Sequence, residues 1–240
     1  MAELSLVIPC ILNHLYPQTA EKSVKIFQKL GYSINIAENQ GCCGYPYLVN
    51  GERGAVKELA QKMLFDFQTG KRDHKIASLS PQCHYTISRS YPYLFHNSVM
   101  HNLSQKVLSD VLDIFSILAE LQIVITPPER QLLVIDNLSD LSLINTITGY
   151  NSKDTNWITQ DSGYGCSGVG SGMNKFNTKA ARLSVLDYCK FANENNVNTI
   201  TFTDEFSLSF ADSVIEQDKL SLKTQHIFDV LYEQLFTTND

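Results

Sequence analysis

Four cysteines in three separate segments are the residues of this sequence best suited to chemistry. Cys42 and Cys43 stand side by side between two glycines, Cys10 lies 32 residues before this pair, and Cys83 lies 40 residues after it. Adjacent side chains of an extended strand point to opposite faces, so two neighbouring thiols converge only where the backbone turns sharply. The flanking glycines permit such a turn because they adopt positive φ at little steric cost.

Thiolates at Cys10, Cys42, Cys43 and Cys83 would meet the ligand number of two kinds of centre. A [4Fe–4S] cluster takes four cysteines, and so does a closed tetrahedral zinc site. Backbone N–H groups of the glycine turn and nearby helix N-termini would favour the ionised thiols by lowering their pKa. Spacings of the Cys-x-x-Cys type are absent here. The residues alone therefore leave iron–sulfur and zinc both open.

Composition and charge narrow the possible partners and compartment. The chain has 240 residues, with 19 Lys and Arg against 25 Asp and Glu, a formal charge of −6. A phosphate backbone would be repelled, so we expect no nucleic-acid partner. No run approaches the roughly 20 apolar residues of a membrane span, and the N-terminus lacks a basic secretory signal start. We expect a soluble cytoplasmic protein without a transmembrane segment, in which thiols stay reduced.

The first half alternates strand-like and helix-like segments, and each cysteine segment falls between a strand and a helix. Short apolar runs predict the strands, and apolar residues at helical spacing predict the helices. The expected strands are 5–8, 32–36 and 75–79, and the expected helices are 19–30, 52–67 and 104–121. Strand-to-helix turns thus present the four thiols.

The same pattern restarts after residues 126–130, where two prolines break any helix. Residues 133–136 resemble 6–9, and residues 165–168 resemble the turn around Cys42. Ser207 lies 40 residues after Ser167, as Cys83 does after Cys43, and it follows a strand-like run over 198–203.

We therefore predict an α/β fold made by tandem duplication. Alternating strands and crossover helices give mostly parallel sheets with covered faces. The two expected modules are residues 1–125, which carry the cysteine cluster, and residues 126–240, which form a degenerate copy.

The motifs of this chain resemble those of the cysteine-rich CCG family. That family includes the cysteine-rich subunit of heterodisulfide reductase, the iron–sulfur subunit of glycolate oxidase and the lactate-utilisation iron–sulfur protein A. The resemblance covers nearly the whole length and rests on Pro9-Cys10, Gly41–Pro46, Ser80–Cys83, Tyr91–Phe95, Val111–Phe115 and His226–Leu231. It implies two CCG modules in tandem and iron–sulfur clusters or, in some modules, zinc.

Departures from the family pattern restrict what the resemblance implies. The heterodisulfide reductase members have Cys-x-x-Cys in the third element, whereas Thr86 stands three residues after Cys83 here. The lactate-utilisation type fits this single cysteine better. In the second module only Cys166 remains, with Ser167, Ser207 and either Asn137 or Ser139 at the other thiol positions. Because hydroxyls are poor cluster ligands at pH 7, we expect no cluster in that module.

The resemblance implies an iron–sulfur electron-transfer subunit or accessory protein of a 2-hydroxy-acid oxidoreductase complex of the lactate or glycolate type. Its partners would be other oxidoreductase subunits, flavin or iron–sulfur proteins, and it would be a non-catalytic redox subunit. The expected cofactor is a [4Fe–4S] cluster, with zinc as the alternative. Two other functions stay open: a disulfide or thiol reductase subunit of the heterodisulfide reductase type, and a non-redox scaffold that binds zinc or no metal.

The remaining polar and sulfur residues have simpler interpretations. Cys189 lies in an expected helix and is interpreted as a core side chain, and Cys166 as a relic of the lost site. His14 and His84 could supply a nitrogen ligand, although single histidines are more often surface or packed residues. The glycine-rich run 163–172 lacks the Lys-Ser/Thr of a P-loop. Nothing in their spacing singles out Asp136, Asp161 and Asp204 as an acid/base group.

Overall fold

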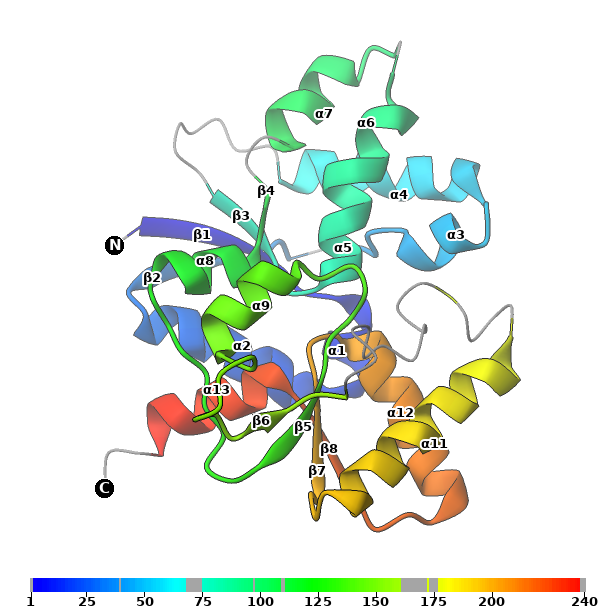
Figure 1. Cartoon of the computed structure of the whole chain (residues 1–240). Helices are drawn as coiled ribbons and strands as arrows, with labels where there is room; N and C mark the ends of the chain where they lie inside the picture. The colour runs from blue at the N-terminus through cyan, green and yellow to red at the C-terminus, as the bar shows by residue number, and fades with distance from the viewer. Residues whose placement is uncertain are drawn as a thin grey trace. The chain divides into compact units, whose positions relative to one another are not determined.

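A computed structural model gives the fold of the chain (Figure 1). It describes residues 2–38, 40–67, 75–96, 98–108, 111–160, 172 and 177–237. The chain divides into two compact units, Met1–Ile117 and Leu118–Asp240. The module boundary after residue 125 that the sequence suggests stays a prediction. Among the described residues, no helix is long and apolar enough to cross a membrane.

The first unit is built on a four-stranded parallel sheet. The strands are β1 (Ala2–Val7), β2 (Tyr32–Asn35), β3 (Lys75–Ser78) and β4 (Val111–Asp113), in the order β2-β1-β3-β4. Residues 4–7 of β1 are all buried, as are residues 76–78 of β3. Strands covered on both faces are the expected form of parallel sheets whose crossover helices lie against them.

Helices connect these strands and cover the sheet. They are α1 (Cys10–Leu15), α2 (Pro17–Lys29), α3 (Tyr45–Val49), α4 (Arg53–Asp66), α5 (Pro81–Tyr85), the π-helix η1 (Thr86–Ser90), α6 (Tyr91–Leu94), α7 (His101–Leu108) and α8 (Ile114–Glu120). Helix α2 buries Ile26 and Phe27 and is followed by Gly31, whose φ of 93° only glycine adopts easily. Helix α4 packs against α3, α6 and α7 (Figure 1).

The second unit repeats this sheet. Its strands are β5 (Gln131–Val134), β6 (Trp157–Ile158), β7 (Thr199–Phe202) and β8 (Lys223–His226), all parallel and in the order β6-β5-β7-β8. Its described helices are α9 (Leu141–Thr148), α11 (Thr178–Glu194), α12 (Glu205–Asp218) and α13 (Ile227–Phe236). Helix α12 packs on β7 and β8 and lies beside α11 (Figure 1). The predicted α/β fold with two similar modules is confirmed.

Matching hydrogen bonds show which residues of the two sheets correspond. The Leu79 N–H donates to the Val7 carbonyl at 3.2 Å, and the Thr203 N–H donates to the Val134 carbonyl at 3.1 Å. The chain after β3 therefore has the same register relative to β1 as the chain after β7 has relative to β5.

The fourth strands correspond as well. Asp113 ends β4 and accepts from the Phe115 N–H, while His226 ends β8 and accepts from the Phe228 N–H. An Ile-Phe pair follows both capping residues. The duplication therefore extends over all four strands of each sheet.

The helix predicted over 104–121 is wrong in its middle. The structure ends α7 at Leu108, forms β4 over Val111–Asp113 and begins α8 at Ile114. Val111, Leu112 and Asp113 pair with Ile76, Ala77 and Ser78 of β3. Residues 111–113 lie within a run of apolar residues at helical spacing, so the local sequence does not indicate a strand. Their pairing with the distant strand β3 decides their conformation.

Candidate functional site

The three cysteine segments meet at one end of the first sheet. Cys10 is the first residue of α1, three residues beyond the end of β1. Cys42 and Cys43 lie in the turn before α3, and Cys83 is the third residue of α5, which follows β3. Since β1 and β3 are neighbouring parallel strands, the segments that leave their carboxyl ends start side by side.

The four thiols form a connected series. The Cys10 thiol donates to Cys42 Sγ at 3.8 Å. The Cys43 side chain lies close enough to those of Cys42 and Cys83 for both to influence its pKa. Cys43 and Cys83 are buried, whereas Cys10 and Cys42 are partly exposed. The series thus runs from the surface at Cys10 into the core at Cys83.

Gly44 shapes the turn that carries the cysteine pair. Its φ is 88°, in the left-handed region, and its N–H donates to Cys42 Sγ at 3.3 Å. A Cβ at this position would lie 3.1 Å from Val56 Cγ1 on α4, so there is no room for a larger residue without a shift. The glycine therefore serves both the turn and the close packing of α4 on it.

Two polar side chains tie the other segments to the sheet end. The Gln40 amide accepts from the Ile8 N–H at 3.1 Å and donates to the Ile8 carbonyl. The Ser80 hydroxyl caps α5 by accepting from the Cys83 N–H at 3.4 Å. Gln40 thus holds the segment before the cysteine pair against the end of β1, and Ser80 fixes the backbone of Cys83.

The pKa values of the adjacent residues Cys42 and Cys43 shift in opposite directions. Hydrogen bonds from Cys10 and Cys43, joined by the Gly44 N–H, lower the pKa of Cys42 to about 3, although partial burial opposes the shift. Hydrogen bonds to Cys42 and Cys83, with complete burial, raise the pKa of Cys43 well above its usual range. At neutral pH Cys42 is a thiolate stabilised by thiol donors, the form in which cysteine binds metals or attacks disulfides.

Tyr91 supports the turn from behind, a role that sequence reasoning missed. It is fully buried on α6, and its hydroxyl donates to the Cys43 carbonyl at 2.9 Å. The hydroxyl also lies 3.5 Å from Met63 Sδ of α4. The Tyr-Pro-Tyr motif marks this residue in the sequence, but nothing local indicates that the tyrosine reaches the cysteine turn.

The thiol set fits a metal centre in the kind of donor it offers. Four free cysteines connect through their sulfur atoms, and the Cys42 thiol is ionised at neutral pH. Within the described ranges, however, no three Cys, His, Asp or Glu side chains already surround a common point at metal-binding distance. A bound centre would therefore draw Cys10, Cys42, Cys43 and Cys83 into a different mutual arrangement.

Among the other residues weighed from the sequence, His14 lines a pocket of about 180 Å³ together with Cys10. His14 is exposed on α1, and burial lowers the pKa of the partly buried His84. The Thr86 hydroxyl donates to the Gln82 carbonyl of its own helix at 2.8 Å. Cys189 is buried in α11, as expected of a core residue. Cys166, Ser167, Asp161 and the glycine-rich run, except for Gly172, lie outside the described residues.

In the described part of the second unit, Ser207 and Asn137 stand at two of the four thiol positions. Ser207 is the third residue of α12, and its N–H donates to the capping Asp204 carboxylate at 2.8 Å, as that of Cys83 does to Ser80. Because Val134 corresponds to Val7, Asn137 rather than Ser139 occupies the position equivalent to Cys10. Both replacements are hard donors that suit iron–sulfur binding poorly.

Buried carboxyl groups gather at this end of the second sheet. Asp136, Asp204 and Glu205 have no solvent exposure. Asp136 follows β5, its N–H donates to the Thr203 hydroxyl, and its Oδ1 accepts from the Leu138 N–H. Burial, with the nearby charge of Asp204 and then of Glu205, raises the pKa of Asp136 well above its usual range. Asp136 therefore keeps its proton to a higher pH than it would in the unfolded chain.

Residues 5–88 match the family described as CCG, cysteine-rich domain. All four cysteines of the site lie in this range, and the resemblance seen in the motifs is confirmed.

Curated relatives of the chain are named lactate utilization protein A. The one from Exiguobacterium sp. is 27% identical over 97 residues, which are 40% of this chain and 39% of that protein. The one from Bacillus subtilis is 27% identical over 108 residues, which are 45% of this chain and 44% of that protein. The similarity thus spans less than half of the length of either relative.

Solved structures with a related arrangement are distant. An aspartate racemase homologue from Pyrococcus horikoshii aligns over 99% of this chain and 98% of its own, with 11% identity and a TM-score of 0.33. The glutamate racemase of Francisella tularensis aligns over 98% of this chain and 80% of its own, with 9% identity and a TM-score of 0.37. Both scores are low, so the fold class rests on the strand order described above.

Replacing Tyr91 by Phe tests the support of the cysteine turn. The buried Cys43 carbonyl would lose its donor, so we expect the free energy of unfolding to fall by about 1–2 kcal/mol in urea denaturation. Tyr93→Phe is the matched control, because Tyr93 is 84% exposed and should tolerate the change. Equal stability of the two variants would contradict the role of Tyr91.

Replacing Asp136 by Asn tests the buried carboxyl group. Above about pH 4 the unfolded chain releases the Asp136 proton, whereas the folded chain keeps it. The free energy of unfolding of the wild type therefore decreases as pH rises from about 4 toward the raised pKa. The Asp136→Asn substitution keeps an oxygen that accepts from the Leu138 N–H, and it removes the decrease of stability with rising pH. Its stability relative to wild type should therefore increase between pH 4 and pH 8 in thermal unfolding.

The Asp140→Asn variant provides a control of opposite sign. Hydrogen bonds from the Ser142 hydroxyl and N–H lower the pKa of Asp140, so its carboxylate stabilises the fold above pH 4 and loses this effect in acid. The loss of stability caused by Asp140→Asn should therefore become smaller as the pH falls. A pH-independent difference for Asp136→Asn would show that Asp136 is not protonated in the fold.

Proposed function

We propose that Cys10, Cys42, Cys43 and Cys83 bind one iron–sulfur cluster, most simply of the [4Fe–4S] type. The single observation that carries the proposal is the connected series of four thiols at the end of the first sheet, with Cys42 already ionised. The CCG domain that contains all four supports it. A bound cluster would accept and release one electron at a time.

The chain's own residues would hold the cluster and limit its access to water. Gly44 and Tyr91 fix the turn that presents Cys42 and Cys43, and Ser80 fixes Cys83. The N–H of Gly44 already points to a sulfur atom, and such hydrogen bonds raise the reduction potential by stabilising added negative charge. Burial of Cys43 and Cys83 would shield the inner side.

We further propose that the protein is an electron-transfer subunit or accessory protein in a 2-hydroxy-acid oxidoreductase system of the lactate or glycolate type. The similarity to proteins named lactate utilization protein A supports this setting. Other flavin or iron–sulfur subunits would be its partners. The five described cysteines are free thiols, in keeping with a reducing, cytoplasmic environment.

A zinc site is the second candidate, and one distance favours it. Zinc–sulfur bonds of about 2.3 Å in a tetrahedron separate the sulfur atoms by about 3.8 Å. The sulfur atoms of Cys10 and Cys42 are 3.8 Å apart. Zinc would be redox-inert, so this alternative implies a structural protein instead of an electron carrier.

Thiol–disulfide chemistry is a third candidate, favoured by the low pKa of Cys42. The Cys42 thiolate could attack a substrate disulfide, which breaks the S–S bond, releases one thiol and forms a mixed disulfide with Cys42. Cys10 would then attack Cys42 Sγ and release the second thiol, leaving a Cys10–Cys42 disulfide that a thiol reductant must reduce again. Thr86 occupies the position of the fifth thiol found in the heterodisulfide reductase members of the family, which argues against that particular site.

Metal analysis of protein purified without oxygen tests the proposal. We expect about four iron and four acid-labile sulfide atoms per chain, with a brown chromophore that bleaches on reduction. Cys42→Ser and Cys43→Ser should each lose nearly all iron, because a protonated hydroxyl replaces a soft thiolate. Stoichiometric zinc, or no metal, in the folded anaerobic protein would refute the electron-transfer role.

Cys189→Ser is the matched control for these variants. Cys189 is a buried cysteine of α11 in the second unit, so its loss should leave iron per folded chain unchanged. Loss of iron in this variant alone would place the centre outside the first unit.

A further inference from the structure

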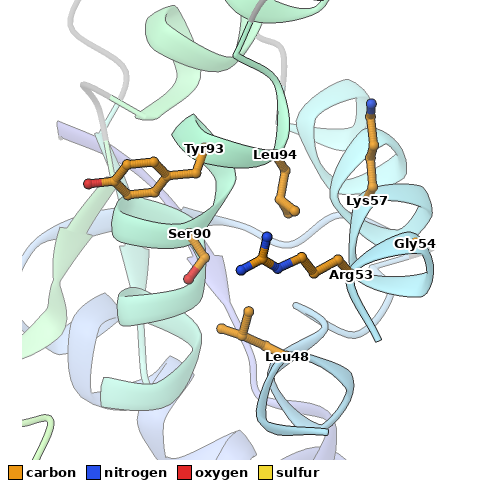
Figure 2. A pocket seen from close by; sticks show the side chains of 7 residues that line it. All are labelled: Leu48, Arg53, Gly54, Lys57, Ser90, Tyr93 and Leu94. Carbon is orange, nitrogen blue, oxygen red and sulfur yellow. The ribbon is translucent and has the colours of Figure 1, made fainter. Parts of the chain in front are cut away.

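The first unit contains a pocket that takes no part in the thiol site. It has a volume of about 580 Å³, within the range of about 300–1,000 Å³ of small-molecule sites. Helices α3, α4 and α6 and the π-helix η1 supply its lining: Leu48, Arg53, Gly54, Lys57, Ser90, Tyr93 and Leu94 (Figure 2). We call it the Arg53 pocket.

Positive charge without an internal partner is the main feature of the Arg53 pocket. Neither Arg53 nor Lys57 forms a side-chain hydrogen bond or ion pair within the part of the chain that the structure describes. The nearby Glu52 carboxylate accepts from the Asn50 amide and does not line the pocket. Arg53 and Lys57 thus make this pocket wall locally positive in a chain of net charge −6.

Arg53 is exposed to solvent, and its guanidinium group extends across the pocket (Figure 2). Figure 2 shows Arg53 extending from α4 into the space between Leu48, Leu94 and Ser90, while the Lys57 ammonium lies toward the rim. A guanidinium offers two parallel N–H donors that match a carboxylate. The Ser90 hydroxyl, which makes no hydrogen bond of its own among the described residues, can add a third donor.

The beginning of α4 adds to the same preference. Helix α4 has 14 residues and no acidic residue in its first turn, and its N-cap side chain makes no capping hydrogen bond. Gly54, in that first turn, lines the pocket, and a Cβ built on it meets no atom within 4 Å. The N-terminus of α4, where anions are favoured, thus contributes to the pocket wall, with the carboxylate of its N-cap residue Glu52 outside the lining.

Apolar groups flank the charged ones. Leu48 and Leu94 lie on either side of the guanidinium in Figure 2, and the Tyr93 ring forms part of the rim. Phosphate alone would leave this surface exposed to water. A ligand with an anionic head and an apolar body would cover both parts of the pocket.

We propose that the Arg53 pocket binds organic acids, with the carboxylate on Arg53 and Lys57 and the alkyl chain on Leu48 and Leu94. This site lies beyond the proposed iron–sulfur function and does not depend on it. A chain without any metal centre would still bind the acid, so the two proposals can fail separately.

Calorimetric titration with sodium acetate, hexanoate, octanoate and inorganic phosphate at constant ionic strength tests the proposal. Affinity should rise about fourfold for each methylene group buried, hence about 16-fold from hexanoate to octanoate. Arg53→Gln should weaken octanoate binding about tenfold or more, because a charge-assisted hydrogen bond is lost. Arg53→Lys should recover only part of the affinity, since the ammonium cannot bind in a bidentate way.

Two further variants separate binding from folding. Arg89→Gln removes an arginine of η1 that does not line the pocket, and octanoate affinity should be unchanged. Gly54→Leu projects a side chain into open space at a helical position, where it should preserve or raise the melting temperature. The same variant should abolish octanoate binding by filling the pocket.

Three results would overturn the proposal. Equal octanoate affinity in wild type and Arg53→Gln would show unspecific apolar association. Tighter binding of phosphate than of octanoate would show that the pocket does not select ligands with an apolar body. Absence of heat with every probe in the folded wild type would show that the pocket binds no such anion.

Discussion

The parallel pairing of β1 with β3 is the constraint on which the thiol site depends. Its last contact, from the Leu79 N–H to the Val7 carbonyl, brings two distant segments to one end of the sheet. Cys10 begins the helix after β1, and Cys83 lies in the first turn of the helix after β3. Gln40 fastens the third segment to Ile8 at the same end. Local turns then need only orient the sulfur atoms, because the sheet has already brought the segments together.

The second unit shows that the same constraint operates where Asn137 and Ser207 stand at the positions of Cys10 and Cys83. Thr203 and Val134 make the same strand-end contact, and the following helix is capped at the same position by Asp204 instead of Ser80. Buried carboxyl groups occupy the sheet end, and one of them keeps its proton in the fold. The scaffold therefore tolerates changed side-chain chemistry where β5 and β7 end, which is consistent with duplication followed by loss of a centre in one copy.

Sequence patterns were sufficient for the fold class and for the residues that gather, and insufficient for their geometry. Apolar runs and glycine turns predicted β1, β2, β3, β5 and β7, but β4 depends on pairing with β3 and has no local signal. The cysteine types and spacing predicted the gathering at the sheet end. The unequal pKa values of Cys42 and Cys43 arise from contacts between segments, and so does the support from Tyr91. Likewise the Arg53 pocket joins separate helices whose packing no local pattern encodes.

The π-helix between Cys83 and Tyr91 makes the length of this segment as important as its composition. Residues Thr86–Ser90 form wider turns, which accommodate an additional residue compared with an α-helix. If the same residues wound as an ordinary α-helix, the extra residue would no longer be absorbed, and everything beyond it would rotate by about 100°. The Tyr91 hydroxyl would then leave the Cys43 carbonyl, and Ser90 would leave the wall it shares with Arg53. The wide turn thus sets the rotational phase of two separate sites.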